Sequence, residues 1–266
     1  EGAGSCWERG AKELRLAARG KRLGVAQQHE AAAAETARAL LRRAVRAARA
    51  ACGGGGGGDA PVALGNALCE AAELEPEGEG AEAALREAAA AYEGAMAASG
   101  REVGTLSNLA QALLRLGDRA PAWAGGSGGR ASFERAASLF AEAVSLSDSA
   151  EGDDLPGLLH DWGCGLHACA ERAHREGEPE LAERCLQEAA GRLAHAASFD
   201  AGDAAPRNAL GDVHQLWADV MESRGAPPGE VAARRHAAVS EGYGLALAVD
   251  GGDPDARVGS AEALAG

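Results

Sequence analysis

One arrangement of apolar and small residues occurs four times between residues 61 and 250. In each copy a bulky apolar residue is followed directly by Gly or Ala. Two further residues of the same helical face lie three positions before the bulky residue and three positions after the Gly or Ala. The copies are Pro61-x-x-Leu64-Gly65-x-x-Leu68, Leu106-x-x-Leu109-Ala110-x-x-Leu113, Leu159-x-x-Trp162-Gly163-x-x-Leu166 and Arg207-x-x-Leu210-Gly211-x-x-His214. The pattern predicts four amphipathic helices, each with a small residue at which a neighbouring helix approaches closely.

A second pattern follows each of these segments. It has a small or β-branched residue, a bulky residue four positions later, and Ala three positions beyond that. It occurs as Ala88-x3-Tyr92-x2-Ala95, Ala136-x3-Phe140-x2-Ala143, Ala189-x3-Leu193-x2-Ala196 and Val239-x3-Tyr243-x2-Ala246. One helical pair cannot bury its own apolar face, so successive pairs should stack. We therefore expect repeats over about residues 61–100, 103–150, 155–202 and 204–252, with a partial repeat over 253–266.

Composition supports an all-α fold. The 266 residues include no Ile, and aromatic residues make up only 3%. Strands prefer β-branched and aromatic side chains, whereas Ala, which is abundant in this chain, has the highest helix propensity. The chain is long enough to bury a sizeable core, either as two compact domains or as one elongated array.

The N-terminal block differs from the rest of the chain. Residues 1–52 are predicted to form a basic helical pair, with helices at about 6–19 and 26–51, and this pair is interpreted as a degenerate repeat or a separate unit. A glycine-rich linker over 53–60 separates it from the solenoid of residues 61–266. The second helix carries its arginines largely on one side, at Arg38, Arg42, Arg43, Arg46 and Arg49. A membrane-surface helix would look similar, but the apolar side is mostly Ala and too thin to insert well.

The order of the two patterns resembles the tetratricopeptide repeat, a helix-turn-helix unit of 34 residues with W-x2-L-G-x2-Y followed by A-x3-F-x2-A. The resemblance covers residues 61–250, and it implies an all-α fold that is an α-solenoid of tetratricopeptide-like repeats. The chain departs from the family in its spacing, because Gly65, Ala110, Gly163, Gly211 and Gly259 of the partial last repeat lie 45, 53, 48 and 48 residues apart. It also lacks the opening aromatic residue in every copy. We therefore expect longer helices or inserted loops, and an irregular superhelix.

The same resemblance implies a partner-binding groove. In the family, the concave surface is lined by residues of the first helix two before, two after and five after the leucine of the Leu-Gly pair. The residues at these positions that we predict to contact a partner are Asn66, Ser107, Gln111, His160, Cys164, His167, Asn208, Asp212 and Gln215. This set predicts a polar, nearly uncharged groove. No Lys occurs after Lys21, so the clamp with which co-chaperone members hold a peptide carboxylate is absent.

Neither catalysis nor a cofactor is predicted. The chain contains no H-E-x-x-H motif, and its Gly-rich stretches lack the Gly-Lys-Ser/Thr ending of a phosphate loop. His160, Cys164 and His167 lie at i, i+4 and i+7 and His174 extends the row, a spacing that zinc could use. No ligand from a second helix is evident, so these residues are interpreted as polar groove residues and no metal site is predicted.

Charge is divided unevenly along the chain. Residues 1–52 carry 11 Lys and Arg against 5 Asp and Glu, whereas residues 53–266 carry 15 against 35. An acidic body argues against a nucleic-acid groove along the repeats, because phosphate contacts require concentrated Lys and Arg. We expect a non-catalytic interaction scaffold or adaptor, a subunit or assembly factor that binds other proteins of a larger complex. The alternative is a peripheral subunit of a ribonucleoprotein, such as an organellar ribosome, that contacts RNA through its N-terminal helices.

Location is predicted from three weaker observations. Cys6, Cys52, Cys69, Cys164, Cys169 and Cys185 show no disulfide framework, which fits a reducing compartment. No apolar run approaches the length of a transmembrane helix. The sequence begins at Glu1 without Met, as a processed organellar precursor would, although a sequence starting partway along a longer chain would look the same. We expect the interior of a chloroplast or mitochondrion, with the cytoplasm as the alternative.

Overall fold

A computed structural model of the chain describes residues 35–53, 59–74, 79–121, 123–124, 128–147 and 155–265. Secondary structure within these residues is helical throughout, with no strand, which confirms the all-α prediction. The predicted helix over 6–19, and the first part of the one over 26–51, lie outside the described residues. No helix in the described part of the chain is both long and apolar enough to cross a membrane.

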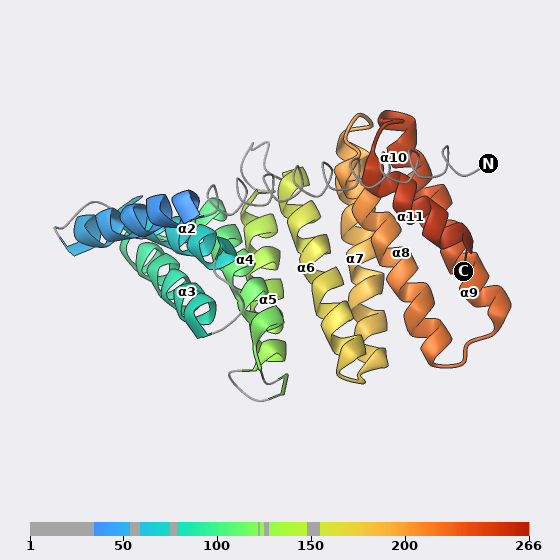
Figure 1. The fold of residues 1–266 in the computed structure, drawn as a ribbon, viewed down its shortest axis with the longest axis horizontal. Coiled ribbons are helices and arrows are strands. Elements are labelled where there is room, and N and C mark those ends of the chain that lie inside the picture. The colour runs from blue at the N-terminus through green and yellow to red at the C-terminus, as the bar shows by residue number, and fades with distance from the viewer. Residues whose placement is uncertain are drawn as a thin grey trace, which may run out of the picture.

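The helices follow one another as antiparallel pairs joined by short connections. After a helical segment over residues 35–53, they are α2 (Asp59–Leu74), α3 (Glu79–Ser99), α4 (Val103–Arg119), α5 (Gly129–Ser147), α6 (Leu155–Arg175), α7 (Pro179–Phe199), α8 (Ala205–Ser223), α9 (Pro228–Ala237), a π-helical segment η1 (Ala238–Tyr243), α10 (Gly244–Val249) and α11 (Pro254–Ala265). Figure 1 shows α2 to α8 following one another along the long axis, with α9, α10 and α11 packed together at the C-terminal end. The architecture is an α-solenoid. Asp59 and Ala60 belong to α2, so the predicted linker ends two residues earlier than expected.

Each pair closes where the two sequence patterns meet. A Cβ atom at Gly65 would lie 2.5 Å from Cε1 of Tyr92, and one at Gly163 would lie 2.6 Å from Cγ of Leu193. A Cβ at Gly211 would lie 2.6 Å from Cδ1 of Tyr243. These side chains of the second helices are buried. The small residue of the first pattern therefore makes room for the bulky residue of the second, as the sequence predicted.

The curvature of the solenoid follows from which helices approach their neighbours. The first helices form a continuous series of backbone contacts, from α2 to α4, α6, α8 and α11. Among these described helices, the Cα atoms of α3 and α5, and of α5 and α7, stay more than 8 Å apart. The array therefore curves with its first helices on the inner side. We call the inner surface formed by α2, α4, α6, α8 and α11 the first-helix groove.

Candidate interaction groove

The N-terminal half of the first-helix groove is crossed by hydrogen bonds between side chains of successive helices. The Tyr92 hydroxyl donates to Oδ1 of Asn66 over 2.7 Å, and Nδ2 of Asn108 donates to the same oxygen over 3.2 Å. Nε2 of Gln111 donates to Oδ2 of Asp161 over 2.7 Å. Burial raises the pKa of Tyr92, which keeps its hydroxyl protonated and able to donate. The predicted residues Asn66 and Gln111 therefore lie in this groove, already bonded to their neighbours.

Asn108 and Asp161 were missed by the sequence prediction. Each lies directly before the bulky residue of its repeat, Leu109 or Trp162. That position is one residue away from those used by the family groove. The hydroxyl of Ser107, by contrast, was predicted to face the groove, but this residue is buried with 7% of its surface exposed.

The middle of the groove carries a cation. Nδ1 of His160 lies 3.5 Å from Oδ1 of Asp161, and its Nε2 lies 3.6 Å from Sγ of Cys164. The hydrogen bonds to Asp161 and to Cys164 raise the pKa of His160 to about 10, so this side chain is protonated at neutral pH. His167 differs, because burial lowers its pKa and keeps it neutral. Among the described residues, no group of three or more His, Cys, Asp or Glu side chains is arranged to hold a metal ion.

The C-terminal end of the groove opens into a pocket of about 570 Å³ between α6, α8 and α11, which we call the acidic pocket. Its polar lining includes His167, Asn208, Gln215 and Tyr243, and its carboxylates come from Glu171, Asp212, Asp219, Asp255 and Glu262. No Lys or Arg lines it. The expectation of a nearly uncharged groove is therefore wrong at this end. Four of the five carboxylates lie outside the positions taken from the family pattern, which explains the error.

Hydrogen bonds within the acidic pocket come mostly from uncharged donors. The Tyr243 hydroxyl donates to Oδ1 of Asp212 over 2.6 Å, and burial together with this carboxylate raises the pKa of Tyr243. Nε2 of Gln215 donates to Oε2 of Glu262 over 3.4 Å. On the adjoining α11 side, Nδ2 of Asn208 donates to Oδ2 of Asp253 over 2.6 Å.

The charge of the acidic pocket is hardly compensated within the chain. Of its carboxylates, Asp219 lies 3.7 Å from Nη2 of Arg235. The other four form no ion pair with any described residue. The pocket therefore retains several negative charges on one concave surface. Such a surface attracts cations from solution.

The arginines of the helix over residues 35–53 are mostly engaged inside the chain. Nε of Arg38 donates to the carbonyl oxygen of Leu74 over 2.8 Å, and Arg42 pairs with Glu35 over 2.8 Å. Arg49 forms a two-pronged contact with the carboxylate of Glu87 on α3 at 2.7 and 2.5 Å. The remaining two predicted contact residues, Arg43 and Arg46, are exposed and have no described partner.

Comparisons with known proteins identify no family. No family model matches the chain, and no curated protein matches it. Among solved structures, the chain is similar to BtubC (BKLC) from P. vanneervenii, with 17% sequence identity and a TM-score of 0.49. The match covers 88% of this chain and 90% of that one.

Proposed function

We propose that the protein is a non-catalytic interaction scaffold whose acidic pocket binds an arginine- or lysine-rich segment of a partner protein. The observation that carries this proposal is a concave surface with five carboxylates and no lining cation. We also propose that the helical pairs are divergent tetratricopeptide repeats. Three of the four pairs close by contact between a Gly and a bulky residue, which supports this assignment because it matches the order of the two halves of the repeat.

The arrangement of donors and acceptors in the acidic pocket favours a basic peptide. Ionised carboxylates are acceptors with several lone pairs, and Asp212 uses only some of them on the Tyr243 hydroxyl. Guanidinium groups bind carboxylates in a two-pronged geometry, and these charge-assisted bonds are stronger than neutral ones. Asp212 on α8 and Glu262 on α11 lie on different helices, so they can hold successive basic side chains of an extended segment.

Binding of a fluorescent nona-arginine peptide, followed by fluorescence anisotropy, tests the proposed function. The double variant Asp255→Asn with Glu262→Gln should weaken binding by about twofold to thirtyfold, since each of the two exposed pairs contributes about 0.2–1 kcal/mol. Raising the salt concentration should weaken it further. The matched control removes two exposed carboxylates outside the pocket, through Glu102→Gln with Glu230→Gln. Equal losses in both double variants, or no binding by the wild type, would overturn the proposal.

A second candidate function rests on Arg43 and Arg46. These two residues are exposed and lie on adjacent turns of the helix over residues 35–53. Two arginines placed in this way could contact RNA phosphates, which supports a role in a ribonucleoprotein. This support is weaker than it was from sequence, because Arg38, Arg42 and Arg49 are bonded within the chain. Replacing Arg43 and Arg46 by Gln should reduce RNA binding and its salt dependence if this function holds.

Location in a chloroplast or mitochondrion stays a prediction, with the cytoplasm as the alternative. Sequencing the N-terminus of the native protein tests it. An initiator Met directly before Glu1 would contradict processing at that position.

A further inference from the structure

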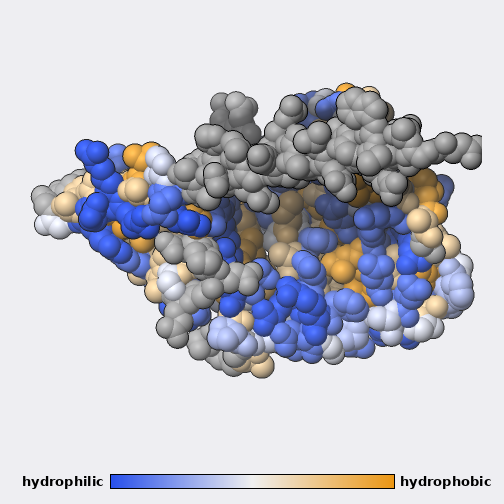
Figure 2. Space-filling model, viewed as in Figure 1, coloured by the Kyte–Doolittle hydropathy of each residue, from blue (hydrophilic) through white to orange (hydrophobic). Residues whose placement is uncertain are grey.

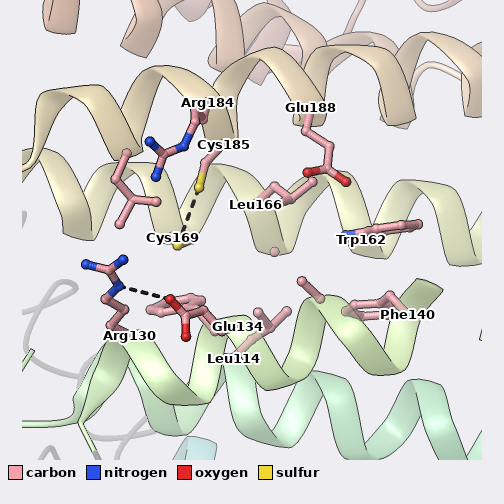
Figure 3. A pocket seen from close by; sticks show the side chains of 14 residues that line it. Leu114, Arg130, Glu134, Phe140, Trp162, Leu166, Cys169, Arg184, Cys185 and Glu188 are labelled. Atoms are coloured by element: carbon pink, nitrogen blue, oxygen red, sulfur yellow. Dashed lines mark hydrogen bonds and ion pairs between the residues drawn. The ribbon is translucent and has the colours of Figure 1, made fainter. Parts of the chain in front are cut away.

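Two cysteine thiols face each other between the helices of the central pair. Sγ of Cys169 on α6 and Sγ of Cys185 on α7 lie 3.7 Å apart, within hydrogen-bonding distance for sulfur (Figure 3). Both cysteines are free. Among the described cysteines, no other two lie within hydrogen-bonding distance of each other. We call Cys169 and Cys185 the thiol pair.

A cavity of about 280 Å³ between α5, α6 and α7 gives small molecules access to the thiol pair. Both cysteines belong to its lining. Each is 8% exposed, whereas Leu186 and Ala189, which belong to the core on α7, are 0% exposed. Hydrophilic side chains cover most of the described surface that Figure 2 shows, and the thiol pair lies below such a surface, between helices. The pair is therefore shielded from large reagents without being sealed in the core.

The surroundings of the thiol pair favour ionisation of one thiol over the other. A hydrogen bond from Cys169 lowers the pKa of Cys185 against the opposing effect of burial, and the guanidinium groups of Arg184 and Arg130 lower it further. The same hydrogen bond, together with burial, raises the pKa of Cys169. The nucleophile in thiol chemistry is the thiolate. Cys185 is therefore the attacking thiol of the pair, and Cys169 is the second thiol that can react with its product.

We propose that the thiol pair is a reversible oxidation site for a small, uncharged peroxide, represented by hydrogen peroxide. The Cys185 thiolate attacks one peroxide oxygen, so that an S–O bond forms and the O–O bond breaks, and the hydroxide that leaves takes up a proton to become water. Cys169 then attacks the sulfur of this sulfenic acid. An S–S bond forms, the S–O bond breaks, and a second water leaves. Overall the two thiols lose two electrons and two protons, and hydrogen peroxide is reduced to two molecules of water.

The positions of the two cysteines in the fold suit this reaction. They belong to antiparallel helices, α6 and α7, that follow each other directly in the chain. A disulfide bond is about 2.05 Å long, so the two sulfur atoms must approach each other by about 1.7 Å. The product links the helix that contributes His160 to the first-helix groove covalently to its partner helix. In a reducing compartment, which the sequence predicts, such a disulfide is transient and reports oxidation.

The test treats the reduced full chain with hydrogen peroxide under native conditions. Samples taken over time are quenched with N-ethylmaleimide in denaturant, and their peptides are mapped by mass spectrometry. We expect a peptide pair linked through Cys169 and Cys185 within one molecule, which dithiothreitol separates again. The link should form faster than the chain unfolds, with the unfolding rate taken from urea jumps extrapolated to zero urea. This measurement on the wild type does not depend on the folding of any variant.

Three variants assign the roles of the two thiols. Cys169→Ser removes the second thiol, so Cys185 should stop at the sulfenic acid, which dimedone labels. In Cys185→Ser, dimedone should label Cys169 about threefold or more slowly than it labels Cys185 in Cys169→Ser, because rate follows the thiolate fraction. Cys164→Ser is the matched control, since this cysteine contacts His160 outside the cavity lining, and it should form the link at the wild-type rate.

Three results would overturn the proposal. The first is a wild-type protein in which peroxide produces no link between Cys169 and Cys185. The second is a link that forms no faster than the chain unfolds, because the native thiol pair is then not the reacting species. The third is equally fast dimedone labelling in Cys169→Ser and Cys185→Ser, which would contradict the assignment of Cys185 as the attacking thiol.

Discussion

Replacing Gly163 by Leu tests the contact that closes the central helical pair. A Cβ atom at this position would lie 2.6 Å from Cγ and 2.9 Å from Cδ2 of Leu193, and 3.4 Å from the carbonyl oxygen of Ala189. Leu193 is 0% exposed, so it has no free space into which to turn. The substitution therefore forces α6 and α7 apart or moves buried side chains off their preferred rotamers, which costs about 1–3 kcal/mol.

Helix propensity acts in the opposite direction and sets the size of the net effect. Exchanging Gly for Leu inside a helix contributes up to about 1 kcal/mol. The expected net result is a free energy of unfolding lowered by about 1–2 kcal/mol, or a Tm lowered by roughly 2–8 °C for a chain of this size. Thermal unfolding followed by far-ultraviolet circular dichroism measures it.

Gly191 provides a matched control in the same helical pair. It lies inside α7, is exposed, and an added Cβ atom would meet nothing within 4 Å. Gly191→Leu should therefore gain the propensity term alone and raise the free energy of unfolding by up to about 1 kcal/mol. A rise in Tm for Gly163→Leu would refute the packing argument, and with it the helical register on which the groove residues rest.

Three further predictions concern side-chain pairs. Tyr92→Phe removes the hydroxyl that donates to Asn66 within the α2–α3 pair and should lower the free energy of unfolding by about 0.5–1.5 kcal/mol in urea titrations. The hydrogen bond to Asp161 raises the pKa of His160 to about 10 in the folded state. The wild type should therefore lose stability relative to His160→Gln as the pH rises from about 6.5 to 10. A stability difference that does not change with pH would contradict this. Sγ of Cys169 and Sγ of Cys185 lie 3.7 Å apart, so the oxidant diamide should join them in a disulfide that peptide mapping detects and that Cys169→Ser prevents.

The sequence predicted the pairing of helices because that pairing depends on periodicity within each helix. Gly65 and Tyr92 belong to patterns that recur, and their contact follows from helix geometry once the two segments are antiparallel. The bond from Gln111 to Asp161 could not be predicted in this way. It joins two different repeats. Whether Gln111 and Asp161 meet depends on how far α6 is shifted along its axis relative to α4, and α5, which lies between them in the chain, sets this shift.

Charge was the feature for which sequence gave the least information. The arginine excess of residues 1–52 is visible in the sequence, but the pairing of Arg49 with Glu87, in a different helix, depends on tertiary packing. The acidic pocket could not be recognised from the sequence either. Its carboxylates are spread over the sequence from Glu171 to Glu262, and none is adjacent to another, so no local charge run marks the site.

The hydrogen bonds along the first-helix groove determine where a partner would gain most binding energy. Asn66 and Gln111 already bond to neighbouring helices, so a partner reaching them must replace existing bonds and gains little net free energy. Near the C-terminal end, Glu171 and Asp255 have no described ion pair, and a guanidinium group arriving there adds bonds without breaking any. The N-terminal pairs therefore contribute a rigid, prebonded scaffold. Partner affinity should be concentrated in the acidic pocket.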